Sequence, residues 1–277
     1  MTPVLLPGLT KITNITSGAN HAMAMDSKGA VYIWGGGEQN QLGYHVVQRT
    51  GSESKKTCLK PQPLRTRIKK FLAIYTGLDH SFAIDQKHQV WSWGLNSFGA
   101  CGIEEGAGDD NSAVHTPSLI KALNLENDTV THIAGGQHHS IAITAKGKAL
   151  AWGKVDGAEV GLDMDSVPRT STIQDEKGDP RIVIVPTEVP DIDGKATYAS
   201  AGPNHTILIT NKGQAYGWGF NGTYQLGLGP NTDVDNATWE LPEHIDNTAV
   251  RGRTLNGSGC GGQFSMWTAA MREESSN

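Results

Sequence analysis

The stretch Gly18-Ala19-Asn20-His21, followed thirteen residues after its histidine by Trp34-Gly35, decides the fold because the pattern recurs along the chain. Three later copies with the same internal spacing begin at Gly77, Gly136 and Gly202. A broken fifth copy begins at Gly261 and has Phe264 in the histidine position. The starting glycines are 59, 59, 66 and 59 residues apart, so the chain is an array of repeated units.

Each unit predicts short β-strands rather than helices. The segment after the histidine and the segment ending in Trp-Gly are short and rich in apolar, aromatic or β-branched residues, as in Val31-Tyr32-Ile33-Trp34. Glycine ends the turn between the two segments in three copies, where a positive φ is favoured, and His88 takes that place in the second copy. Several segments are apolar on both faces, which indicates sheets covered on both sides.

Small sheets of this kind stack on one another, and radial stacking predicts a β-propeller. We expect one partial propeller domain over residues 1–277. The repeat cores are expected near 18–43, 77–102, 136–161 and 202–227, with a closing partial repeat at 261–271. The stretch from 163 to 181 is polar and contains Pro and Gly, so we interpret it as a mobile surface loop that lengthens the third unit.

Composition excludes several classes of function. The net charge of −5 and the 37% hydrophobic content are typical of a soluble globular protein, and bulk charge does not favour nucleic acid or membrane. The three cysteines are widely separated, so no zinc site and no cofactor are expected. No nucleophile–base pair or phosphate-binding loop is found, which gives an enzyme with a small-molecule substrate almost no support.

The repeat resembles that of the regulator of chromosome condensation family. Gly-x-x-His, Trp-Gly and Gln41-Leu42-Gly43 follow its pattern, and Gly35 to Gly43 and Gly135 to Ser140 are close to segments of its founding member. The ending at Gly261 to Ser265 resembles the C-terminus of its fungal homologues. The resemblance implies a seven-bladed ring, of which about four and a half repeats are present here and the N-terminal repeats are missing. A genuine smaller ring is the alternative.

By this resemblance the chain acts as a guanine-nucleotide exchange factor on a Ran-like small GTPase, without covalent chemistry, in the nucleus or otherwise in the cytoplasm. Histones or chromatin are a second implied partner, and no membrane is involved. Family members press a hairpin wedge near the phosphate-binding loop of the GTPase, and that hairpin would lie upstream of this chain. The alternative is a non-catalytic interaction module or an inactive fragment, because similar repeats also serve in adaptors.

One rim of the propeller is the expected GTPase-binding site. The residue before each motif histidine is polar and lies on the equivalent loop, so these side chains should share one face. With Tyr44, which stands where the family commonly has arginine, the predicted rim comprises Asn20, Tyr44, Asp79, His138, Asn204 and Gln263. The resemblance matches His138 to a functional histidine and Asn20 to a functional aspartate. The alternative is that these are solvated loop residues.

Two further sets complete the expectations. Basic residues concentrate after Tyr44, and the chromatin-contact candidates are Arg49, Lys55, Lys56 and Lys60, followed by Arg65, Arg67, Lys69 and Lys70. A solvated loop is an equal alternative. The motif histidines and tryptophans are expected to be structural, with a histidine ring nitrogen bonding nearby backbone. They are His21, His80, His139, His205, Trp34, Trp93, Trp152 and Trp218.

Overall fold

The computed structural model describes residues 5–6, 8–44, 57–229 and 238–271. The described residues form strands joined by turns and loops, apart from 3₁₀ helices at Lys121–Leu123 and Arg169–Ser171. The expected all-β class is therefore confirmed. The chain divides into two compact units, residues 1–124 and 125–277, each of which is described by itself.

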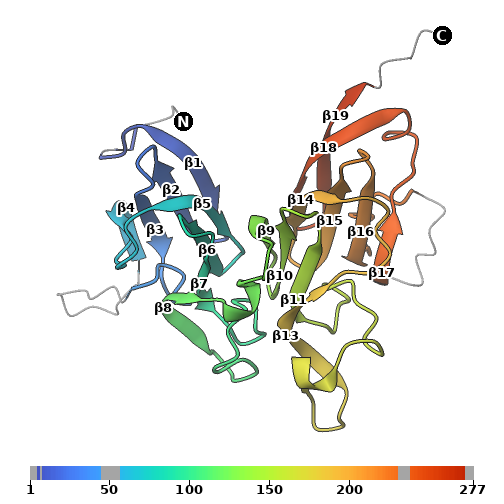
Figure 1. Cartoon of the computed structure of the whole chain (residues 1–277), viewed down its shortest axis with the longest axis horizontal. Coiled ribbons are helices and arrows are strands. Elements are labelled where there is room, and N and C mark those ends of the chain that lie inside the picture. The colour runs from blue at the N-terminus through green and yellow to red at the C-terminus, as the bar shows by residue number, and fades with distance from the viewer. Residues whose placement is uncertain (1–4, 7, 45–56, 230–237, 272–277) are drawn as a thin grey trace. The chain divides into compact units, whose positions relative to one another are not determined.

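The first unit contains two four-stranded antiparallel sheets whose strands follow chain order (Figure 1). One consists of β1 (Ile12–Ser17), β2 (His21–Asp26), β3 (Val31–Gly36) and β4 (Thr57–Pro63). The other consists of β5 (Phe71–Thr76), β6 (His80–Asp85), β7 (Val90–Leu95) and β8 (Ala113–Leu119).

The second unit contains a five-stranded sheet, a four-stranded sheet and a hairpin. The first sheet has the order β9 (Val130–Gly135), β10 (His139–Thr144), β11 (Ala149–Lys154), β13 (Pro180–Glu188) and β12 (Thr172–Gln174). The second has the order β14 (Ala196–Ala201), β15 (His205–Thr210), β16 (Ala215–Phe220) and β17 (Thr238–His244). The hairpin pairs β18 (Arg253–Cys260) with β19 (Ser265–Met271).

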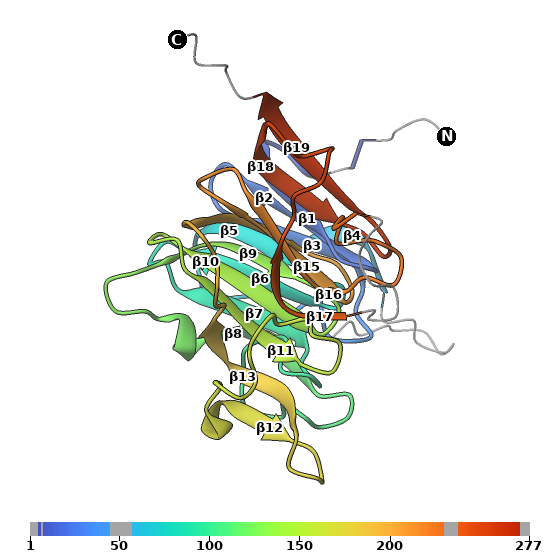
Figure 2. The ribbon, with the colours of Figure 1, turned by 90° about the vertical axis from the view of Figure 1, so that its right-hand side faces the viewer.

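The interpretation of residues 163–181 as a loop was wrong for the part that begins at Arg169. A 3₁₀ turn leads into β12, which pairs antiparallel with the start of β13, and Figure 2 shows this hairpin projecting from the rest of its sheet. The Asp175 carboxylate accepts hydrogen bonds from the backbone of Lys177 and Asp179, and Gly178 has a φ of 88°. The polar Pro- and Gly-containing sequence therefore encodes a tight hairpin turn.

The turns between the second and third strands of each sheet have the expected chemistry. Gly29, Gly147 and Gly213 have φ values of 80°, 85° and 71°, and His88 adopts 60° in the same place, as predicted. Three of the four strands that begin at a motif histidine are wholly buried. Every residue of β6, β10 and β15 is buried, which fits sheets packed on both faces.

The glycine of each Gly-x-x-His motif is needed because the histidine ring occupies the space beside its Cα. A Cβ on Gly77 would lie 2.1 Å from Cε1 of His80, and one on Gly202 would lie 2.3 Å from Cε1 of His205. Phe264 takes the histidine's place in the broken copy, since a Cβ on Gly261 would lie 2.4 Å from its ring. The spacing of three residues thus encodes ring-on-backbone packing.

Three of the four motif histidines also join neighbouring sheets, and for these three the expected backbone partner was wrong. In the first unit, Nε2 of His21 lies 2.8 Å from the Ser81 hydroxyl of the next sheet. That hydroxyl donates to the Gln41 carbonyl at 3.2 Å, and the Trp93 indole N–H donates to the same carbonyl at 2.9 Å. A serine hydroxyl has one proton, which it gives to Gln41, so Nε2 of His21 must be the donor to Ser81. Burial lowers the pKa of His21 to about 4, so the ring is neutral near pH 7.

The second unit repeats this chain of hydrogen bonds from a histidine through a hydroxyl to a backbone carbonyl, which we call the relay. His139 bonds the Thr206 hydroxyl at 2.8 Å, and Thr206 and Trp218 both donate to the Glu159 carbonyl, at 3.2 and 2.9 Å. His205 bonds the Ser265 hydroxyl at 3.0 Å. His21, His139 and His205 therefore each bond a hydroxyl in the next repeat, 60 or 67 positions away.

Candidate functional site: a rim of polar loop residues

In the first unit, the loops that carry Asn20 and Asp79 lie side by side. The Ala19 N–H donates to the Leu78 carbonyl at 2.9 Å, which aligns the β1–β2 loop with the β5–β6 loop. Asn20 is exposed, and Asp79 is half-buried. These two predicted rim residues therefore lie on adjacent loops at the same end of their sheets.

In the second unit, the equivalent loops form a similar series. The Gln137 N–H donates to the Pro203 carbonyl at 3.2 Å, so the loop of His138 adjoins the loop of Asn204. A Cβ on Gly202 would lie 2.8 Å from the Gly261 carbonyl oxygen, which brings the loop of Gln263 next in order. His138 is half-buried, whereas Asn204 and Gln263 are exposed.

The Trp-Gly motif fixes the backbone of each rim residue. The carbonyl of the rim residue accepts the N–H that follows Trp-Gly, at 2.9 Å for His138 with Lys154 and 2.8 Å for Asn204 with Phe220. The motif glycine makes this approach possible, because a Cβ on Gly153 would lie 2.4 Å from the His138 oxygen. Gly153 also has a φ of 114°, which disfavours any other residue. The repeat thus fixes the backbone of each rim residue, whereas the rim side chain differs from one repeat to the next.

Electrostatics distinguish the two half-buried rim residues. Burial raises the pKa of Asp79, whose carboxylate lies 3.5 Å from the Gln41 amide nitrogen. Burial, together with the nearby Lys154 ammonium, lowers the pKa of His138 to about 4. His138 is therefore neutral near pH 7 and can both donate and accept hydrogen bonds.

A charged pair beside His138 was missed from the sequence. The Lys154 ammonium lies 3.8 Å from the carboxylate of Glu159, whose side chain is 1% exposed, and 3.6 Å from that of Asp156. Glu159 occupies the position held by Gln41 and Gln225 in other repeats, and all three side chains accept a backbone N–H two residues earlier. This departure from the repeat was the signal that could have identified the pair.

The remaining predicted site residues are Tyr44 and the chromatin-contact candidates. Tyr44 is half-buried against the core of the first unit, and the guanidinium of Arg65 lies 5.4 Å from its ring centroid. Of the chromatin-contact candidates, Lys60 is exposed on β4, whereas Arg49, Lys55 and Lys56 lie outside the described residues.

The described part of the chain contains neither a candidate metal-binding cluster nor a candidate membrane-spanning helix. No group of three or more His, Cys, Asp or Glu side chains there could hold a metal ion. Within the same residues, no helix has the length and apolarity needed to span a bilayer.

Comparison with known proteins identifies the family. The RCC1-like domain profile matches residues 1–267. The chain belongs to the RCC1-like domain family. It is 37% identical over 268 residues to the guanine nucleotide exchange factor SRM1 of Saccharomyces cerevisiae, covering 96% of this chain and 52% of the relative. It is 34% identical to protein pim1 of Schizosaccharomyces pombe, covering 93% of this chain and 45% of pim1.

The solved structure of Prp20p from Saccharomyces cerevisiae superposes on this RCC1-like chain with a TM-score of 0.87 and 34% identity. The match covers 99% of this chain and 59% of Prp20p. This likeness confirms the β-propeller fold expected from the repeats. The chain spans about half the length of the curated relatives it matches.

Proposed function

We propose that this chain acts as a guanine-nucleotide exchange factor on a Ran-type small GTPase. The proposed contacts are Asn20 and Asp79 in the first unit and His138, Asn204 and Gln263 in the second. The observation that carries the proposal is the 37% identity, over 96% of the chain, to a relative named as a guanine nucleotide exchange factor. The polar, loop-borne character of the rim supports the same conclusion, because such loops on a rigid scaffold commonly bind partners.

Exchange of this kind needs no covalent chemistry, so the protein regulates an enzyme rather than being one. A factor that binds the nucleotide-free GTPase more tightly than the nucleotide-bound form lowers nucleotide affinity by the same factor. The rim offers neutral donors and acceptors at His138, Asn204 and Gln263 and a carboxylate at Asp79. These groups suit hydrogen bonds to a folded protein surface.

A second candidate function is a binding module without exchange activity. The feature that favours it is Asn20, which lacks the negative charge that the resemblance assigns to that position. Binding would persist in this case, whereas the differential affinity that drives nucleotide release would be reduced.

A histone or chromatin contact in the nucleus accompanies the first candidate. The Prp20p structure was described together with binding to Gsp1p and histones, and this supports a similar pair of partners here. Lys60, exposed on β4, is the described member of the proposed contact, and its ammonium suits phosphate or acidic protein.

Release of labelled GDP from a Ran-type GTPase tests the proposal. We expect the chain to accelerate release and His138→Ala and Asp79→Asn to weaken the acceleration. His115→Ala and Asp110→Asn are matched controls, since both residues are exposed outside the rim loops. A folded chain that binds the GTPase without accelerating release would support the binding module, and a chain that does neither would overturn both candidates.

A further inference from the structure

A pocket in the first unit lies apart from the rim. It has a volume of about 530 Å³ and is formed by the loop before β5, the start of β7 and the middle of β8. Its lining residues are Arg65, Thr66, Arg67, Ile68, Trp91, Thr116 and Pro117. This volume falls in the range of pockets that hold a ligand or a peptide side chain.

The pocket combines apolar walls with cations that have no acidic partner among the described residues. Ile68, Trp91 and Pro117 provide the apolar surface, and the exposed guanidinium groups of Arg65 and Arg67 stand beside it. Neither arginine forms an ion pair with any described residue. Lys69 and Lys70 follow on the same loop and are also exposed.

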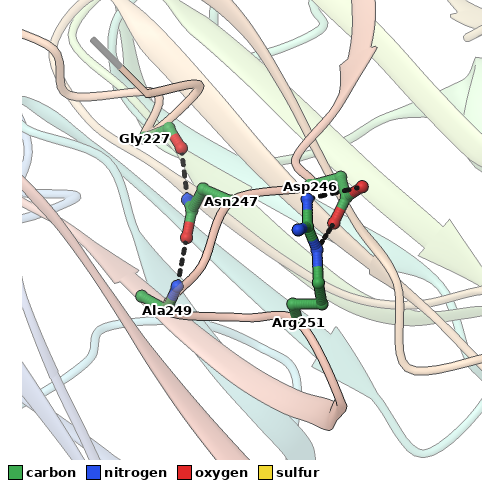
Figure 3. Close-up of polar contacts among 5 residues, drawn as sticks. All are labelled: Gly227, Asp246, Asn247, Ala249 and Arg251. Carbon is green, nitrogen blue, oxygen red and sulfur yellow. Dashed lines mark hydrogen bonds and ion pairs between the residues drawn. The ribbon is translucent and has the colours of Figure 1, made fainter.

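The equivalent loops of the other repeats contain carboxylates, which this loop lacks. In the loop after β17, Arg251 pairs with Asp246 at 3.3 Å, and Asn247 bonds Ala249 and Gly227 (Figure 3). Residues 64–70 read Leu-Arg-Thr-Arg-Ile-Lys-Lys and include no Asp or Glu. The positive charge at residues 65–70 is therefore not neutralised within its own loop.

Two contacts set the shape of the pocket before any partner arrives. The Trp91 indole donates to the Asp85 carboxylate at 3.0 Å, and that carboxylate is buried and also accepts two backbone N–H bonds. The Arg65 guanidinium lies over the Tyr44 ring. A preformed wall and a positioned cation reduce the ordering cost of binding.

Strand β5 separates this pocket from the rim. The pocket loop ends at the first residue of β5, and the Asp79 rim loop begins after its last, so the two lie at opposite ends of a six-residue strand. Six residues of strand span roughly 20 Å. A ligand in the pocket would therefore leave the rim of the first unit open.

We propose that this pocket docks an acidic peptide segment, with one apolar side chain inserted against Ile68, Trp91 and Pro117 and flanking carboxylates on Arg65 and Arg67. Guanidinium groups bind carboxylates in bidentate fashion, and the apolar walls match a peptide anchor residue. A nucleic acid would use the arginines but has no apolar side chain for the walls. The inference does not depend on exchange activity.

Titration of the full chain with a fluorescent peptide tests the proposal. The probe is a ten-residue peptide of Asp and Glu around a central Leu-Phe pair, and a version with Ser-Ser at the centre tests the anchor. We expect Arg65→Ala/Arg67→Ala to weaken binding by roughly tenfold or more, consistent with two partly exposed charged contacts. Ile68→Ser tests the wall. The control Lys28→Ala/Lys87→Ala removes two exposed cations from turns of the same unit.

The results of these titrations distinguish an acidic peptide from other ligands of the pocket. Weaker binding with the arginine and Ile68 variants, a preference for Leu-Phe over Ser-Ser, and unchanged binding of the lysine control would support the proposal. Equal binding of both peptides, equal losses in the two double variants, or tighter binding of a DNA duplex would overturn it. Circular dichroism of each variant verifies folding, and an unchanged response to His138→Ala separates this pocket from the rim.

Discussion

Replacing Gly77 with alanine should destabilise the first unit, although the same change in an open site would be mildly stabilising. The φ of Gly77 lies outside the positive range, so alanine meets no backbone strain there. Its Cβ would lie 2.1, 2.5 and 2.7 Å from Cε1, Nε2 and Nδ1 of the His80 ring. Since ordinary contacts begin near 3.4 Å, the ring must move by more than 1 Å.

The ring has little room for that movement. His80 is 0% exposed, and its ring packs edge-on against Phe82 with centroids 5.2 Å apart. Overpacking of a buried site costs about 1–3 kcal/mol, and the reduced freedom of the unfolded chain returns about 0.4–1 kcal/mol. We therefore expect a net loss of about 1.3 kcal/mol, measured as a lower urea midpoint by tryptophan fluorescence and circular dichroism.

Two companion variants make the result decisive. Gly262→Ala lies beside a motif glycine but meets no heavy atom within 4 Å, so it should leave the midpoint nearly unchanged. His80→Ala removes the clashing ring, and Gly77→Ala should cost much less in that background. A wild-type midpoint for Gly77→Ala, or an equal loss with and without the His80 ring, would refute the packing explanation.

Three further predictions concern the relay and the rim. Ser81→Ala removes the acceptor of the buried His21 N–H and should cost about 1–3 kcal/mol of unfolding free energy in urea titrations. Because burial lowers the pKa values of His21 and His205 to about 4, from 6.5, stability should be constant above pH 6.5 and fall between pH 6.5 and 4, by up to about 1.4 kcal/mol per pH unit for each histidine; a flat stability profile in this range would contradict the assignment. Lys154→Met should raise the pKa of His138, though not to 6.5 because burial remains, and a proton NMR titration of the ring would measure the change.

The repeat spacing determined much of the local geometry in advance. The offset of thirteen from histidine to tryptophan places His21 opposite Gly35 in the β2–β3 register, and the same offset pairs His80 with Gly94. Two strands joined by a tight glycine turn can have only a few loop lengths. The spacing that recurs in every repeat therefore predicted the strands and their pairing. The turn role of His88 could be predicted for the same reason.

The contacts between repeats could not be predicted from one repeat alone. Ser81 follows His80 in the sequence but accepts the hydrogen bond of His21. This role can be recognised only once the packing of neighbouring sheets is known. The hairpin at β12 was missed because a three-residue strand is too short to show periodicity. For the rim, the equivalence of the loops in the sequence identified the candidate positions. The structure was needed to show which of these side chains are exposed and which have pKa values altered by burial.

Positions that are the same in every repeat and positions that differ between repeats therefore report on different properties of this chain. The Gly, His and Trp of the motif recur because each fills a space or bond that every sheet needs, and their recurrence says little about partners. Glu159 departs from Gln41 and Gln225 without changing the local backbone bond, and the added charge lies near Lys154 and His138. A buried carboxylate is costly unless it is paired, so such a substitution is retained only where the surroundings compensate for it. To map the rim, we would therefore first mutate positions at which one repeat has a charged side chain, the other repeats have a neutral one, and the backbone bond is the same.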